Sequence, residues 1–279
     1  MRPAKKKPYV LTYHGDWQES FGSPLRRVSL AVYNKYFINR LLSFADVIIC
    51  PSEYYIEESR FLSKYKKKIC VVPNGIDLDS YNIEFSKSRC REILNLPIDK
   101  KIILFVGNLI PYKGPDVLIK AMEKIVKICP ETFLVIVGNG LMRNELLNIA
   151  LKYNLMKNIR FAGYVDGNEK LLYYKASDIF VLPSTMNTEV FPIVVLEASA
   201  SELAIVVSDL NTFRCIIRDG HNGIVTKKNN EIDLASKIIN LIMEPKECQK
   251  LGQNARNIVN EFTWERISKT TESIYRGII

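Results

Sequence analysis

The sequence lacks long apolar runs and paired cysteine motifs, and it has only two histidines. Its apolar stretches, such as residues 102–106 and 133–137, are far shorter than the roughly 20 residues that cross a bilayer, so we expect no transmembrane helix. The basic N-terminus has no apolar segment typical of secretory signals, which predicts a protein that is not exported. The six cysteines form no Cys-x-x-Cys pair, which indicates reduced thiols in a cytosolic protein and no metal site.

The composition and the charge distribution point to a globular protein with one basic end. The 279 residues are 47% hydrophobic, enough for one or two ordinary cores. The net charge of +9 is concentrated in residues 1–75, which contain 13 Lys and Arg against 6 Asp and Glu. This asymmetry favours an anionic partner there, either a phospholipid surface or a phosphorylated acceptor, and we expect no nucleic acid. A solvated basic face is the commoner explanation of such a charge.

A helix is predicted from Ser23, as its N-cap, to about residue 42, with Pro24 at the first helical position. Apolar residues recur along it at nearly helical spacing, and basic residues lie between them. The apolar set is Leu25, Val28, Val32, Tyr36 and Leu41, and the basic set is Arg26, Arg27, Lys35 and Arg40. Such a helix could lie on anionic lipid. We favour the alternative, in which the apolar stripe packs on a sheet and the cations face water.

Short apolar segments alternate with helical segments along the chain, which predicts an α/β fold with parallel sheets covered on both faces. In the first 75 residues we expect three strands, beginning near Tyr9, Val47 and Ile69. Six more strands are expected near residues 102–107, 133–138, 159–163, 179–182, 204–208 and 223–226. Three strands are about half of an ordinary doubly wound domain. They would leave an open edge, so we expect missing residues or a protein partner that completes the N-terminal domain.

Two strand–loop–helix segments carry candidate phosphate sites. In residues 178–200, Pro192 stands where a helix would begin, and the amides of Ile193 and Val194 follow it. A helix N-terminus at the carboxyl end of a strand suits an anion. Glu189 lies in the loop and Glu197 lies in the helix, so that one carboxylate could meet a sugar and the other a ribose.

The second segment is residues 107–114. Gly107 and Gly114 allow the backbone to approach an anion closely, and Lys113 supplies a mobile cation. Asn108 can donate a hydrogen bond there but carries no charge. One of the two histidines, His14, ends the first strand, at a position where side chains commonly face a cleft.

These motifs resemble those of the retaining GT-B glycosyltransferases of the large group 1 (glycosyltransferase family 4-like) superfamily. Residues 189–197 read E-V-F-P-I-V-V-L-E and resemble the family's E-x7-E segment. Residues 107–114 resemble its G-R-L-x-x-x-K-G segment, with Asn108 in place of the arginine, and Pro192 replaces a glycine. Tyr-His-Gly at 13–15, F-A-G-Y-V at 161–165 and P-N-G-I-D at 73–77 resemble further family segments.

The resemblance implies two Rossmann-like domains, the N-terminal one incomplete. Residues 1–75 would form the acceptor side and residues 76–261 the nucleotide-sugar-binding domain, with a C-terminal helix at 262–279 packing back on the N-terminal domain.

The resemblance also assigns roles to residues. Gly107, Asn108 and Lys113 would hold the donor diphosphate, Glu197 the ribose and Glu189 the transferred sugar. His14 would close over the sugar across the domain cleft. The remaining implied substrate-binding residues are Val165, in the segment that cradles the nucleobase, and Phe191, Ile193 and Val194.

The implied activity is transfer of a sugar from a nucleotide-diphosphate sugar, with retention of configuration and no cofactor or metal, to an unknown saccharide or lipid-linked acceptor. The expected location is the cytoplasm, with a peripheral place on the inner membrane face as a further expectation. Two alternatives stay open. One is a nucleotide-sugar-binding or assembly subunit that needs a partner for the acceptor half, and the other is a nucleotide-sugar epimerase.

Overall fold

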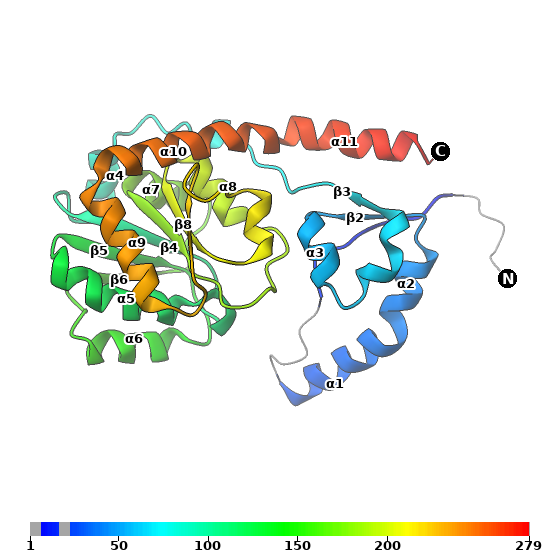
Figure 1. The fold of residues 1–279 in the computed structure, drawn as a ribbon, viewed down its shortest axis with the longest axis horizontal. Helices are drawn as coiled ribbons and strands as arrows, with labels where there is room; N and C mark the ends of the chain where they lie inside the picture. Colours follow the sequence, from blue (N-terminus) through cyan, green and yellow to red (C-terminus); the bar gives the residue numbers. More distant parts are fainter. Residues whose placement is uncertain (1–6, 17–22, 279) are drawn as a thin grey trace.

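The protein consists of two α/β units joined by two crossings of the chain (Figure 1). The structure, a computed structural model, describes residues 7–16 and 23–278. Each unit has its own parallel sheet, one of three strands and one of six. The α/β fold with parallel sheets that the sequence predicts is therefore confirmed.

The C-terminal unit, which we define as β4–β9 with α4–α10, contains the larger core. Its strand order is β6-β5-β4-β7-β8-β9, all parallel. The strands are β4 (Lys101–Val106), β5 (Thr132–Val137), β6 (Ile159–Gly163), β7 (Ile179–Leu182), β8 (Ala204–Ser208) and β9 (Ile224–Thr226). The helices are α4 (Lys87–Ile93), α5 (Pro115–Ile128), α6 (Arg143–Lys152), α7 (Gly167–Ala176), α8 (Ile193–Ala200), α9 (Glu231–Met243) and α10 (Pro245–Val259). The central strands are buried almost without interruption, as strands covered on both faces must be.

The N-terminal unit, which we define as β1–β3 with α1–α3, is much smaller. Its strands β1 (Val10–Thr12), β2 (Val47–Cys50) and β3 (Ile69–Val71) pair in that order, all parallel. Its helices are α1 (Pro24–Val32), α2 (Ile38–Phe44) and α3 (Glu53–Glu58), with a π-helical segment (Tyr33–Phe37) between the first two and a 3-10 helix (Leu62–Lys68) before β3. Within the described residues, β1 is paired on one side alone, so the unit has the open edge that the strand count predicts.

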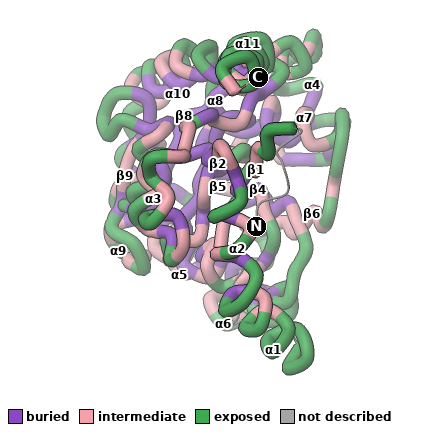
Figure 2. Tube along the Cα trace, turned by 90° about the vertical axis from the view of Figure 1, so that its right-hand side faces the viewer, coloured by how far each residue is buried: buried purple, intermediate pink, exposed green. Residues whose placement is uncertain are grey.

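The prediction that the apolar stripe of the first helix packs on a sheet is wrong for most of its length. Ser23 caps α1 by accepting a hydrogen bond from the amide of Arg26, as expected, but no residue of α1 is buried. Leu25 is 81% exposed and Val28 63% exposed. Figure 2 shows α1 standing out from the body of the molecule. The reason is that α2, through Ile38 and Leu42, takes the place beside the small sheet. We call Leu25, Val28, Val32 and Tyr36 the α1 stripe.

The two chain crossings lie side by side. Ile76, in the first crossing, bridges to Thr263 in the second, and its amide donates to the carbonyl oxygen of Phe262 at 2.8 Å. A Cβ on Gly75 would collide with the ring of Trp264, so glycine is required there for close packing. The final helix α11 (Trp264–Arg276) then runs over the N-terminal sheet, where Ile267 clusters with Ile49 and Val72 (Figure 1).

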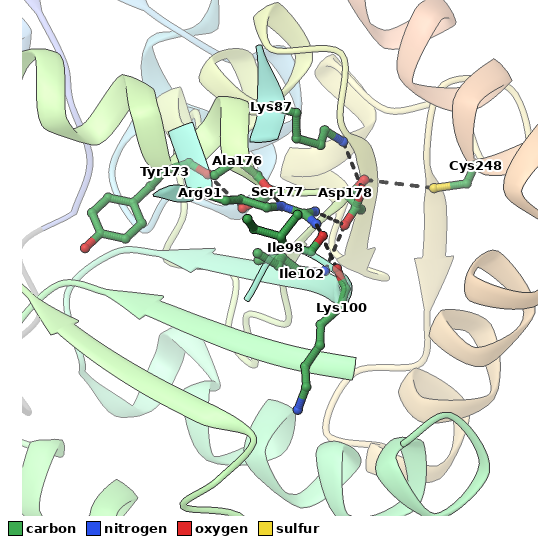
Figure 3. Close-up of polar contacts among 10 residues, drawn as sticks. All are labelled: Lys87, Arg91, Ile98, Lys100, Ile102, Tyr173, Ala176, Ser177, Asp178 and Cys248. Carbon is green, nitrogen blue, oxygen red and sulfur yellow. Dashed lines mark hydrogen bonds and ion pairs between the residues drawn. The ribbon is translucent and has the colours of Figure 1, made fainter. Parts of the chain in front are cut away.

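A partly buried ionic cluster fastens α4 to the amino ends of β4 and β7 (Figure 3). The guanidinium of Arg91 donates to Oδ2 of Asp178 at 2.8 Å, and Nζ of Lys87 lies 2.9 Å from Oδ1. Burial disfavours the charged form of Asp178, but Lys87, the amide of Ile102 and Arg91 together hold its pKa below the usual value. The cluster lies at the opposite end of the sheet from the loops described next.

Candidate functional site

Two loops at the carboxyl ends of β4 and β7 form the centre of the candidate site. The loop after β4 contains residues 107–114, and the loop after β7 contains residues 183–192. The amide of Thr185 donates to the carbonyl oxygen of Tyr112 at 2.7 Å. Gly114 has φ +66°, and a Cβ there would collide with the carbonyl oxygen of Pro183. The glycine is therefore what allows the two loops to touch.

This contact brings Lys113 and Glu189 together. Nζ of Lys113 forms an ion pair with Oε1 of Glu189, and both side chains are largely buried. The hydroxyl of Ser184 lies 3.4 Å from the same carboxylate oxygen. Residues 76 positions apart in the sequence thus form one buried ion pair, and an incoming anion would compete with Glu189 for the lysine.

The start of the first loop is fixed by close backbone packing. Gly138, at the end of β5, has φ +137°, and a Cβ there would collide with the carbonyl oxygen of Gly107. Leu109 is fully buried and fastens the loop to the core, whereas Asn108 is exposed. Sequence reasoning did not single out Gly138 or Leu109, although a glycine after an apolar strand was the available signal.

Helix α8 begins four residues after Glu189. It begins at Ile193, so the expectation that Pro192 is the first helical residue is off by one: Pro192 is the N-cap, with extended ψ. Because the first amides of a helix have no partner within the helix, those of Ile193 and Val194 are available to an anion. The side chain of Ile193 is 47% exposed, whereas Val194 packs partly against the core.

Glu197 lies one turn further along α8, in a cluster that the sequence did not reveal. Its Oε1 is 2.6 Å from Nζ of Lys170, and its Oε2 accepts a hydrogen bond of 2.7 Å from the hydroxyl of Tyr174. Burial, and then the charge of Glu197, raise the pKa of Tyr174 well above its ordinary value, so this hydroxyl stays protonated and donates. Lys170 and Tyr174 stand four residues apart on α7, a helical spacing that could have signalled a shared face.

Two of the predicted substrate-binding residues have side chains placed elsewhere. The ring of Phe191 is 7% exposed and packs on Phe262 at the chain crossing, with ring centroids 5.7 Å apart. The ring therefore belongs to the chain crossing, and only the backbone of Phe191 belongs to the loop. Val165 lies after β6, half-buried against the core.

His14 lies across the gap between the two units, at the end of β1. It is exposed, and with Tyr13 and Asp16 it lines a cavity of about 600 Å³. The opposite wall comes from the C-terminal unit and includes Tyr112 and Thr188, the neighbour of Glu189. The structure therefore places His14 on a cavity that reaches the Glu189 loop.

Asp16 fixes the turn that carries His14. Its carboxylate accepts hydrogen bonds from the hydroxyl of Tyr13 at 2.6 Å, the hydroxyl of Ser59 at 2.7 Å and the amide of Arg60 at 2.9 Å. Its own amide donates to the hydroxyl of Tyr55 at 2.7 Å. Burial, followed by Asp16, raises the pKa of Tyr13, so that this hydroxyl also stays a donor.

The chemistry available at the site is that of cations, amides and carboxylates. No group of three or more His, Cys, Asp or Glu side chains that could hold a metal ion occurs in residues 7–16 and 23–278. Helices long and apolar enough to cross a membrane are likewise absent from that part of the chain.

Two parallel-sheet units that face each other across a cavity, with the candidate site at the carboxyl ends of the larger sheet, are typical of the GT-B class of fold. Comparison with known proteins agrees. The family model described as Glycosyl transferases group 1 matches residues 86–258, and the model described as Glycosyltransferase Family 4 matches residues 1–80. The chain belongs to the group 1 glycosyltransferase family.

Individual relatives support this assignment over nearly the whole chain. An Escherichia coli UDP-Gal:alpha-D-GlcNAc-diphosphoundecaprenol alpha-1,3-galactosyltransferase is 30% identical over 263 residues, which are 92% of this chain and 62% of that protein. The uncharacterized glycosyltransferase MJ1607 of Methanocaldococcus jannaschii is 30% identical and covers 97% of this chain, which spans 70% of it. A Streptomyces bingchenggensis D-inositol 3-phosphate glycosyltransferase is 28% identical, and the chain spans about half of its length, 54%.

Solved structures show the same fold. Anabaena Alr3699/HepE in complex with UDP superimposes with a TM-score of 0.82 at 21% identity, covering 98% of this chain and 73% of that one. The C-terminal domain of the Francisella tularensis group 1 protein LpcC matches with a TM-score of 0.61 at 27% identity, over 67% of this chain and 97% of that domain.

Proposed function

We propose that the chain transfers a sugar from a nucleotide-diphosphate sugar to an acceptor, with retention of anomeric configuration. The observation that carries the proposal is the convergence of Lys113, Glu189, the N-terminus of α8 and Glu197 at the carboxyl ends of β4 and β7. Such a switch point of an open α/β sheet is where ligands bind. The UDP in the HepE structures supports a donor of this class.

In this proposal the donor lies at the carboxyl ends of the strands of the C-terminal unit. Its diphosphate would bind Lys113, the backbone at Gly107 and the amides of Ile193 and Val194. The exposed side chain of Asn108 would donate a further, uncharged hydrogen bond. Lys113 is held until then by Glu189, so the arriving diphosphate exchanges one anionic partner for another. Glu189 is then released towards the transferred sugar.

The nucleoside end of the donor would bind at Glu197, whose carboxylate is already held in position. Glu197 would accept from the ribose hydroxyls, with Lys170 and Tyr174 holding it in place, and the backbone near Val165 would border the nucleobase. During transfer, negative charge grows on the leaving diphosphate, where Lys113 and the helix amides stabilise it without a metal ion. His14 would reach the sugar from across the cavity.

The acceptor would enter through the cavity beside His14. Its lining is largely apolar, with Leu11, Ile38 and Leu41 on one side and Ile110 and Leu141 on the other. A saccharide or lipid-linked acceptor fits this description. The apolar α1 stripe is exposed, and residues 23–44 around it contain four basic residues and no acidic one. This combination favours peripheral binding to an anionic membrane surface, at its cytoplasmic face.

A second candidate function rests on the open edge of β1. Within the described residues, nothing pairs with the outer side of this strand. The chain would then act as a donor-binding subunit whose acceptor half is completed by another polypeptide that adds strands at this edge.

The test is release of nucleotide diphosphate, and transfer to added acceptors, from UDP-, GDP- and ADP-sugars. Glu189→Gln and Lys113→Ala should each abolish turnover while circular dichroism and thermal unfolding stay close to the parent protein. Matched controls are Glu123→Gln and Lys127→Ala, an ion pair on α5 whose lysine is exposed. NMR of the product reports the anomeric configuration. Near-normal turnover in either site variant removes the assignment, and activity that appears only with an added partner favours the subunit.

A further inference from the structure

Glu58 of the N-terminal unit reaches across the gap and holds the Glu189 loop. It is the last residue of α3. Its Oε1 accepts two hydrogen bonds of 2.9 Å, one from Nδ2 of Asn187 and one from Nδ2 of Asn211. Asn187 stands two residues before Glu189, and Asn211 begins the 3-10 helix η5 (Asn211–Cys215) of the C-terminal unit.

The loop is held from its other side by the same 3-10 helix. The buried hydroxyl of Thr212 donates to the carbonyl oxygen of Val190 at 2.9 Å. The side chain of Val190 in turn fills the space where a Cβ on Gly15 would stand, next to His14. Residues 187–190, which include Glu189, are therefore held at both ends. Glu58 binds Asn187 directly, and through Asn211 it also binds the 3-10 helix that holds Val190.

Two features of the surroundings of Glu58 disfavour its charged carboxylate. A carboxylate at the C-terminal end of a helix opposes the helix dipole. Its second oxygen, Oε2, is buried and has no hydrogen-bond partner among the described residues. Opening the gap would hydrate this oxygen and break the two hydrogen bonds that Asn187 and Asn211 donate to Oε1. The gain in hydrogen bonding on closing and the cost of desolvating Oε2 therefore oppose each other. A contact balanced in this way can open and close.

We propose that Glu58 is a positioning residue that couples the approach of the N-terminal unit to the placement of Glu189. The inference rests on the proposed function for the importance of Glu189. When Glu58 engages Asn187 and Asn211, the loop is fixed and the cavity beside His14 is complete. When it disengages, the loop loses the hydrogen bond from Asn187 to the N-terminal unit.

The test needs no substrate. A pair of dyes is attached through unnatural amino acids at the exposed positions Lys64 and Lys228, one in each unit, and single-molecule energy transfer reports their distance. Glu58→Ala should shift the mean transfer efficiency and broaden its distribution at least twofold. Glu58→Gln, which keeps an acceptor oxygen, should restore most of the parent distribution. The matched control is Glu57→Ala, which removes the exposed neighbour paired with Lys66.

The partner side gives an independent variant if Glu58→Ala fails to fold. Asn187→Ala with Asn211→Ala should reproduce the shift, and adding Glu58→Ala to that pair should change the distance no further. With UDP-sugar, nucleotide release should slow about tenfold in Glu58→Ala while UDP affinity changes less than twofold. A distribution that is the same in Glu58→Ala and the parent, or in Glu58→Ala and Glu57→Ala, overturns the coupling. Failure to bind any nucleotide removes the proposed function and leaves the dye result to decide the coupling.

Discussion

Replacement of Arg91 by methionine should destabilise the C-terminal unit strongly. Its guanidinium donates to the carbonyl oxygens of Ala176 at 2.9 Å, Ile98 at 2.7 Å and Lys100 at 3.0 Å, and to Asp178 at 2.8 Å (Figure 3). Methionine has nearly the same length and no donor, so all four acceptors lose a partner.

The size of the effect follows from burial. Arg91 is 6% exposed, so the acceptors are left in a poorly solvated place. Removing one partner of a buried ion pair costs roughly 3–5 kcal/mol. For a unit of this size each kcal/mol shifts the unfolding temperature by about 2–4 °C, which gives a fall of roughly 10 °C.

Differential scanning calorimetry measures this fall, because it can separate the transitions of two units. Arg89→Met is the matched control on the same helix, since that guanidinium is exposed and pairs only with Glu92 among the described residues. It should cost less than about 0.5 kcal/mol. A loss in Arg91→Met no larger than in the control would refute the reasoning. Nucleotide affinity should stay unchanged, because the cluster lies at the far end of the sheet from the donor loops.

Three further outcomes are expected. Gly114→Ala should weaken nucleotide binding at least tenfold, measured by calorimetry, because the new methyl group collides with Pro183 and the left-handed φ costs about 1 kcal/mol in addition; unchanged affinity contradicts the loop contact. Because the folded-state pKa of Asp178 is lowered, its stabilisation is complete above the ordinary value of about 4 and is lost as the pH falls through the lowered one. The stability difference between the parent and Asp178→Asn, from urea unfolding at pH 7 to 3, should therefore shrink only below about pH 4. In sedimentation with phosphatidylglycerol vesicles, the fraction of protein that pellets with the vesicles should be several-fold lower for Val28→Glu than for the parent. Neutral phosphatidylcholine vesicles should pellet neither protein. Equal pelleting of the two proteins with phosphatidylglycerol would contradict a role for the α1 stripe.

The local pattern of the sequence predicts the loops that carry the candidate site, but it does not predict the contacts between those loops. Lys113, Glu189 and Glu197 could be selected because strand, loop and helix follow one another within a few residues, and the chemistry of each loop is local. The contacts between loops could not be read this way. Nothing in the sequence joins Gly114 to Pro183, or Glu58 to Asn187 across the two units, because both depend on how the chain returns on itself.

The α1 stripe shows a different limit. Its periodicity predicts a helix correctly, but periodicity alone does not say what covers the apolar face. In the structure the small sheet is covered by α2, and the stripe faces outward (Figure 2). The ring of Phe191 is a similar case, since its motif is recognisable while its packing on Phe262 depends on the chain crossing.

The most direct test of the central claim, that the loops after β4 and β7 hold a nucleotide-sugar donor, is isothermal titration calorimetry of UDP, GDP and ADP, and of their sugar conjugates, into the purified chain. At least one nucleotide should bind, and Lys113→Ala should abolish that binding while Lys127→Ala leaves it unchanged. The absence of binding by every nucleotide at millimolar concentration, or binding that survives in Lys113→Ala, would contradict the account.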